Sequence, residues 1–134
     1  MNYNELIQLY FERSNALQWY WTLYVVIVGG LLAFSAQRQQ RDFFTTMLVA
    51  VLFCFFAYEN LDAIQDVSHQ RLATLDVIKR SVPIVVAGAM DVKPTLEPTL
   101  NPPTLGSVRT VHVTSDALTV LTLLAMERRR RKVA

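Results

Sequence analysis

The sequence predicts an all-α membrane protein: an antiparallel transmembrane helical hairpin, a long amphipathic extension of its second helix, a Pro-rich loop and a short C-terminal helix. Three observations lead to this prediction. Two uncharged apolar runs lie near the start, an amphipathic pattern follows the second run, and four prolines precede an apolar C-terminal segment. A soluble domain of 134 residues would instead spread its apolar residues along the chain around one core.

The first apolar run, residues 16–36, contains no charged residue and is long enough to cross a hydrocarbon core of roughly 30 Å. Residues 1–15 repeat apolar side chains at helical spacing, which predicts an interfacial amphipathic helix that lies on the membrane or continues into the span. A cleaved signal peptide is the competing interpretation. It is disfavoured because Glu5 and Glu12 precede the run, where a signal peptide carries positive charge.

The second apolar run begins at Phe43 and leads into one long predicted helix over residues 42–82, which crosses the membrane and continues into water. The polar connection before it contains Arg38 and Arg41 and is short, so the two spans must be antiparallel neighbours. Apolar residues gather on one side of the extension. They are Leu61, Ile64, Leu72, Leu75, Ile78 and Val82. We predict that this stripe is a contact surface for a second copy, the N-terminal helix or another protein.

The opposite side of the extension carries acids and an imidazole at steps of three, four and three residues. They are Glu59, Asp62, Asp66 and His69. The spacing between Asp66 and His69 matches carboxylate–imidazole pairs at metal sites in helix bundles, so these four are the candidates for binding zinc, manganese or iron. A solvated helix face has the same pattern, and we therefore assign neither a metal nor a cofactor.

The pair Gly29 and Gly30 interrupts the first span near its middle. A residue without a side chain lets another helix approach closely, so the pair is a candidate contact with a partner helix. Glycine is also common in membrane helices that make no such contact. Both interpretations stay open.

Residues 83–108 combine a short apolar run with the Pro-rich loop. The apolar part, residues 84–92, fits either a strand or a segment that dips into the membrane. The part with the prolines predicts an extended, polyproline-like linker, because proline interrupts both helices and sheets.

Residues 109–134 form the C-terminal segment. Val111 and Val113 alternate with polar residues, which predicts a half-buried strand, and Ser115 then caps a final apolar helix. That helix is too short to span unless it begins near residue 110, with His112 and Asp116 inside the membrane. We favour a third, short or tilted, span. His112 and Asp116 share a face only if their segment is helical.

A cationic cluster follows the final helix. It consists of Arg128, Arg129, Arg130, Arg131 and Lys132. The cluster fixes the membrane topology or binds anionic lipid or a partner. If the final helix spans, this cluster, Arg38 and Arg41 lie on one side of the membrane, which the positive-inside rule places in the cytoplasm.

No sequence motif indicates catalysis. The chain has no P-loop, GxSxG, HExxH or CxxC motif, and its single cysteine, Cys54, cannot form an intrachain disulfide. A net charge of +2 gives no reason to expect nucleic acid. We expect a non-catalytic accessory or scaffold subunit of a plasma (inner) membrane, with lipids and other subunits or copies of itself as partners. The alternative is a homo-oligomeric pore with Glu59 and Asp62 at an acidic mouth.

Overall fold

Three long helices make up most of the protein. The computed structural model of the chain describes residues 1–84, 87–88 and 90–130. In chain order its elements are α1 (Tyr3–Gln37), α2 (Phe43–Arg80), α3 (Lys93–Leu96), the 3-10 helix η1 (Glu97–Thr99) and α4 (Leu105–Arg129). Every element in these described ranges is a helix, and two helices are long and apolar, which confirms the predicted all-helical class.

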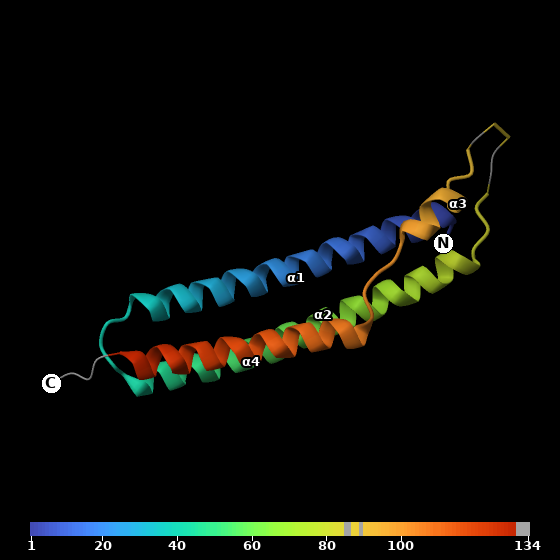
Figure 1. Cartoon of the computed structure of the whole chain (residues 1–134). Coiled ribbons are helices and arrows are strands. Elements are labelled where there is room, and N and C mark those ends of the chain that lie inside the picture. The colour runs from blue at the N-terminus through green and yellow to red at the C-terminus, as the bar shows by residue number, and fades with distance from the viewer. Residues whose placement is uncertain (85–86, 89, 131–134) are drawn as a thin grey trace.

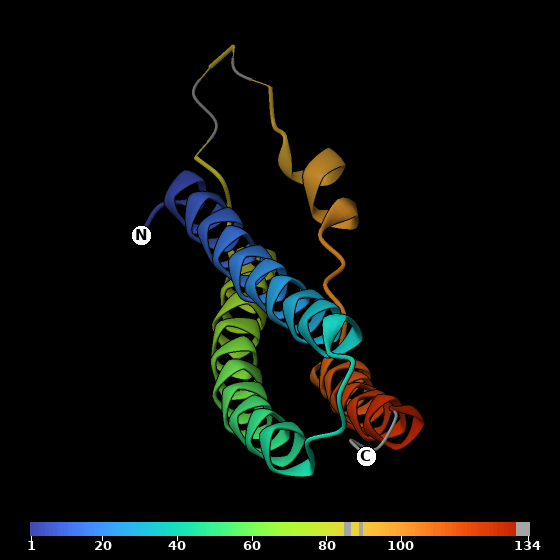
Figure 2. The same cartoon turned by 90° about the vertical axis from the view of Figure 1, so that its left-hand side faces the viewer.

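The helices form an elongated three-helix bundle. α1 and α2 run antiparallel and are joined by residues 38–42, as Figure 1 shows. α4 runs antiparallel to α2 and packs against both other long helices, so the three enclose a common interior (Figure 2). The last turn of α4 lies beside residues 38–42, and we call this the connection end. The opposite end holds the N-terminus, α3 and the last turns of α2.

α1 runs without a break from Tyr3 through residue 15, so the N-terminal residues continue into the first apolar run, the second of the two arrangements predicted for them. A capping box fixes its start. The Asn2 side chain accepts a hydrogen bond from the Glu5 backbone N–H at 2.9 Å, and the Glu5 carboxylate accepts one from the Asn2 N–H at 2.8 Å. These bonds satisfy two of the amide groups that a helix start leaves unpaired.

α2 begins after Asp42, whose side chain accepts a hydrogen bond from the Thr45 backbone N–H at 3.2 Å. Hydrogen bonds from the Thr45 hydroxyl and backbone stabilise the carboxylate and lower the pKa of Asp42 below its ordinary value. The helix ends at Arg80, shortly before Pro83, which disfavours helical backbone in the residue that precedes it. The long second helix is therefore close to its predicted limits.

α4 corrects the prediction for residues 109–114, which are helical and not a strand. Thr104, not Ser115, caps the helix, accepting a hydrogen bond from the Ser107 N–H at 3.2 Å. The alternation of Val111 and Val113 misled the prediction because both are exposed on the outside of the bundle. The buried positions recur at a helical spacing instead. They are Val108, His112, Thr119, Leu123 and Glu127.

The prolines predicted an extended connection between α2 and α4, but the connection contains two short helices, α3 and η1. Pro94 and Pro98 stand in the first turns of α3 and η1, where a missing N–H costs nothing. Of the apolar run 84–92, residues 85, 86 and 89 lie outside the described residues. The others form neither helix nor strand, and Gly88 has a positive φ of 91°.

The buried residues form three clusters that follow one another along the bundle. The cluster at the N-terminal end comprises Tyr3, Leu6, Tyr10, Leu75, Ile78 and Leu100. The next comprises Leu17, Ile64, Val67 and Val108, and the third Tyr24, Phe53 and Ala57. Each cluster joins α1 to α2, so the pairing of these helices is fixed along most of their length.

The apolar stripe of the α2 extension is covered within the chain. Ile64, Leu75 and Ile78 are buried against the N-terminal half of α1, while Leu61 and Leu72 are half-buried. Val82 lies beyond the end of α2 and is exposed. Of the covers predicted for the stripe, the structure shows the N-terminal helix, so these residues do not require a second protein.

Replacing Ile78 by Ala is expected to destabilise the fold by about 2 kcal/mol, because the side chain is fully buried and its loss leaves a cavity between α1 and α2. Thermal unfolding followed by circular dichroism measures the effect. The matched control is Val77→Ala, since Val77 is 48% exposed on the same helix. Equal melting temperatures for the two variants would show that the N-terminal cluster does not stabilise the bundle.

The apolar stretches of α1 and α2 are largely exposed on the outside of the bundle. α1 and α2 are each long and apolar enough to cross a membrane. In the most apolar 18-residue stretch of each helix, only 11% of α1 and 28% of α2 is buried inside the protein. A core helix of a soluble protein would be mostly buried. Large exposed apolar side chains include Trp19, Val25, Phe44, Leu52, Phe55 and Leu118. α4 does not meet the same criterion of length and composition, and its membrane span stays a prediction.

Candidate functional site

The four residues considered as metal ligands lie on the outside of α2. Glu59, Asp62, Asp66 and His69 are all exposed, the placement that a solvated helix face predicts. Within the described residues, no group of three or more His, Cys, Asp or Glu side chains is arranged to hold a metal ion. Polar side chains that hydrogen-bond to one another lie instead inside the bundle.

A hydrogen-bonded network in the bundle interior links all three long helices. We call it the His112 network, and its members are Tyr24 of α1, Asn60 of α2, and His112 and Asp116 of α4. His112 Nδ1 lies 2.8 Å from Asp116 Oδ2, and His112 Nε2 lies 3.1 Å from Asn60 Oδ1. The Tyr24 hydroxyl donates to Asp116 Oδ1 at 2.7 Å. His112 is fully buried.

The surroundings of His112 are aromatic. Its ring centre lies 4.4 Å from that of Tyr24 and 5.6 Å from that of Trp21. Because α4 is helical, His112 and Asp116 lie on one face, as the sequence predicted for a helical segment. The sequence did not predict Tyr24 and Asn60 as members of the His112 network. The signal that could have found Asn60 is an amide at the end of an apolar run, where it needs a partner.

The hydrogen-bond partners determine how many protons the network holds. Asn60 Nδ2 donates to the Tyr20 carbonyl oxygen at 3.2 Å, and a carbonyl can only accept, so Asn60 presents its oxygen to His112. His112 Nε2 must then carry a proton. A second proton must lie between Nδ1 and the Asp116 carboxyl oxygen, since neither atom could otherwise donate to the other.

The pair of His112 and Asp116 therefore has no net charge. It is either an imidazolium beside a carboxylate or a neutral imidazole beside a carboxylic acid, and both forms contain the same number of protons. A pair with no net charge costs less free energy in apolar surroundings than a lone carboxylate or a lone imidazolium. The network thus joins three helices through polar groups whose charges cancel.

A second buried cluster closes the bundle at the connection end. We call it the Arg130 cluster, and its members are Ser35, Arg38, Thr46, Glu127 and Arg130. The Arg130 guanidinium pairs with the Glu127 carboxylate. It also donates to the backbone carbonyl oxygen of Ser35, to the Ser35 hydroxyl at 2.6 Å, and to the Arg38 carbonyl oxygen at 3.1 Å. Thr46 donates to Glu127 Oε2 at 2.7 Å and accepts from Arg38 at 3.1 Å.

The Arg130 cluster supplies hydrogen-bond donors to carbonyls at the end of α1. The Arg38 carbonyl lies just beyond the last helical residue, and the Ser35 carbonyl, which also accepts the Arg38 N–H at 3.3 Å, lies in the last turn. The side chains of Glu127 and Arg130 are only 2% and 6% exposed. The cationic cluster predicted from the sequence included Arg130, and the structure buries this side chain against the Glu127 carboxylate and the α1 carbonyls.

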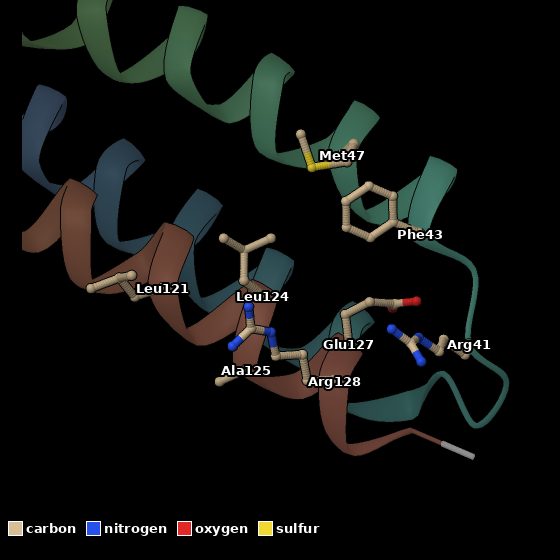
Figure 3. A pocket seen from close by; sticks show the side chains of 8 residues that line it. All are labelled: Arg41, Phe43, Met47, Leu121, Leu124, Ala125, Glu127 and Arg128. Carbon is tan, nitrogen blue, oxygen red and sulfur yellow. The ribbon is translucent and has the colours of Figure 1, made fainter. Parts of the chain in front are cut away.

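The other members of the cationic cluster differ from Arg130. Arg128 and Arg129 are exposed at the end of α4, while Arg131 and Lys132 lie outside the described residues. Arg128 borders a groove between α2 and α4 of about 710 Å³ (Figure 3). The residues that line it are Arg41, Phe43, Met47, Leu121, Leu124, Ala125, Glu127 and Arg128. The groove opens on the outside of the bundle at the connection end.

The glycine pair of α1 lies on the outer surface. Gly29 and Gly30 are exposed, and a Cβ added at either position would meet no atom of the described residues within 4 Å. No contact within this described part of the chain therefore explains two adjacent glycines in the middle of an apolar helix, where each costs helical stability. Their neighbours on this face, Val26 and Ala33, are also exposed.

Comparison of the chain with protein-family models, with curated proteins and with solved structures gave no match.

Proposed function

We propose that the protein is a non-catalytic integral-membrane interaction protein, an accessory or scaffold subunit that packs against a helix of another subunit or of a second copy. The observation that carries the proposal is the apolar outer surface of α1 and α2, most of which the described residues leave uncovered. Lipid tails and membrane helices are the surroundings in which such a surface is stable.

The packing of α4 supports a third span. Val108 packs beside Leu17 and Ile64, and Glu127 bonds to Thr46, so α4 accompanies both apolar helices along most of their apolar length. If α1 and α2 cross a bilayer, α4 lies in the same layer. Its His112 and Asp116 then face the bundle interior and are paired, as ionisable groups inside membranes are.

The distribution of charge supports an orientation. Arg38, Arg41, Arg128, Arg129 and Arg130 lie at the connection end, and the acids there among the described residues are Asp42 and Glu127. The positive-inside rule places this end in the cytoplasm and the N-terminus on the other side of a plasma (inner) membrane. The exposed acids of the α2 extension then lie in water outside, where they need no partner.

The exposed face of α1 around Gly29 is the proposed contact. Gly29 and Ala33 are four residues apart on this face, and small residues at that spacing allow the backbones of two membrane helices to approach closely. The pairing gives van der Waals contact that lipid chains make less well. A role of this kind requires no reactive side chain.

Replacing Gly29 by Leu is expected to weaken the assembly at least about tenfold, because the new side chain holds the partner helix away. We expect the fold to tolerate the change, since no atom of residues 1–84, 87–88 and 90–130 lies within 4 Å of a Cβ at this position. Native mass spectrometry of the detergent-extracted protein gives the assembled fraction as a function of concentration. The control is Cys54→Leu, which enlarges an exposed side chain on α2.

Two results would contradict the proposal. A protein that is monomeric and without partners after mild extraction has no assembly to weaken. An assembly that responds equally to Gly29→Leu and Cys54→Leu does not use the glycine face.

A further inference from the structure

The groove between α2 and α4 has apolar walls that the protein itself leaves open. Phe43 and Met47 of α2 lie across from Leu121 and Leu124 of α4, as Figure 3 shows. Phe43 is 58% exposed and Leu121 is 61% exposed, so these walls belong to the outer surface of the bundle. With a volume of about 710 Å³, the groove is large enough for part of a lipid molecule.

Positive charge that the protein does not neutralise lies at one end of the same groove. Arg130 is paired with Glu127, so the charges of these two residues cancel. Arg41 and Arg128 also line the groove and are exposed, and neither has an ion-pair partner in the part of the chain that the structure describes. A ligand that meets this end of the groove therefore meets two free guanidinium groups.

The charged and apolar parts are arranged along the helix axes in the order of a phospholipid. Arg41 lies in the connection just outside α2, and Arg128 lies in the last turn of α4. Leu121 is two turns earlier in α4, which places it about 10 Å deeper at 1.5 Å per residue. The arginines are thus at headgroup height when the apolar walls face the acyl chains.

From this arrangement we infer that the groove binds an anionic phospholipid from the cytoplasmic leaflet, with its phosphate on Arg41 and Arg128. One acyl chain lies between the α2 wall and the α4 wall. Arginine suits the headgroup because its planar guanidinium donates two parallel hydrogen bonds to phosphate oxygens. A zwitterionic lipid gains less, since its own cation is repelled by the two arginines. The inference rests on the membrane location proposed above.

The test is native mass spectrometry of the full chain in detergent, titrated with phosphatidylglycerol or with phosphatidylcholine of the same acyl chains. The wild-type chain is expected to bind phosphatidylglycerol more tightly. Arg41→Gln and Arg128→Gln are each expected to weaken that binding about fivefold. The matched control is Arg109→Gln, which removes an exposed arginine at the opposite end of α4 and is expected to leave the affinity unchanged.

A second pair of variants tests the apolar wall. Leu121→Trp fills the groove and is expected to lower the occupancy by phosphatidylglycerol. Leu118→Trp makes the same change at a position that is 59% exposed on the same helix but does not line the groove. Equal occupancy in these two variants would overturn the acyl-chain part of the inference.

Equal affinity for the two lipids, or equal losses for Arg128→Gln and Arg109→Gln, would overturn the headgroup site. The same spectra report the assembly state, so the two proposals fail separately. A chain that assembles without preferring phosphatidylglycerol refutes only the lipid site. A monomer that prefers phosphatidylglycerol supports the lipid site and refutes only the interaction role.

Discussion

Replacing Arg130 by Met is expected to lower the free energy of unfolding by about 4 kcal/mol, the largest effect we predict for a single side chain. The change leaves the Glu127 carboxylate, only 2% exposed, without its cation. It also removes the donor to the Ser35 and Arg38 carbonyls at the end of α1. Breaking a buried ion pair from one side costs about 3–5 kcal/mol because the remaining charge has no compensation.

Thermal unfolding in detergent, followed by circular dichroism, should show a fall in melting temperature of more than about 10 °C. The control is Arg129→Met, an adjacent exposed arginine for which we expect a change within about 0.5 kcal/mol. Adding Glu127→Leu to Arg130→Met should recover part of the loss, since it removes the unpaired charge. If Arg130→Met and Arg129→Met melt alike, the Arg130 cluster does not hold the connection end together.

Replacing His112 by Phe is expected to cost about 3 kcal/mol. The phenyl ring fills the fully buried position but gives neither Asp116 nor Asn60 a hydrogen bond. Asp116 keeps the bond from Tyr24 and its side chain is 22% exposed, so the loss should be smaller than at Arg130. The melting temperature in detergent is the measurement, with His69→Phe on the exposed face of α2 as the control.

A double-mutant cycle separates the pairing of His112 and Asp116 from their packing. The single changes are His112→Phe and Asp116→Leu, and the double variant combines them. The double variant should be more stable than the sum of the two losses predicts, because each single change leaves either the buried His112 or the partly buried Asp116 without its partner. Strictly additive losses would mean that the two side chains do not stabilise each other, contrary to the shared proton derived from their geometry.

The candidate sites show which part of the structure a local pattern can predict. His112 and Asp116 share a face because residues 109–114 are helical. The alternation of Val111 and Val113 had wrongly predicted a strand there. Asn60 and Tyr24 come from two other helices, so their membership followed from how the helices pack. The burial of Arg130 could not be predicted from the local pattern for the same reason, since its partners Ser35 and Arg38 lie at the end of α1.

The helical class and the two long apolar helices could be predicted from the sequence, because the length and spacing of apolar residues act within one helix. The amphipathic stripe of α2 could be predicted in the same way. Three features could not be predicted without the packed structure: α1 covers this stripe, α4 begins at Leu105, and polar side chains from three helices meet inside the bundle. These outcomes depend on contacts between distant residues, whose energies outweigh the local preferences of any one segment.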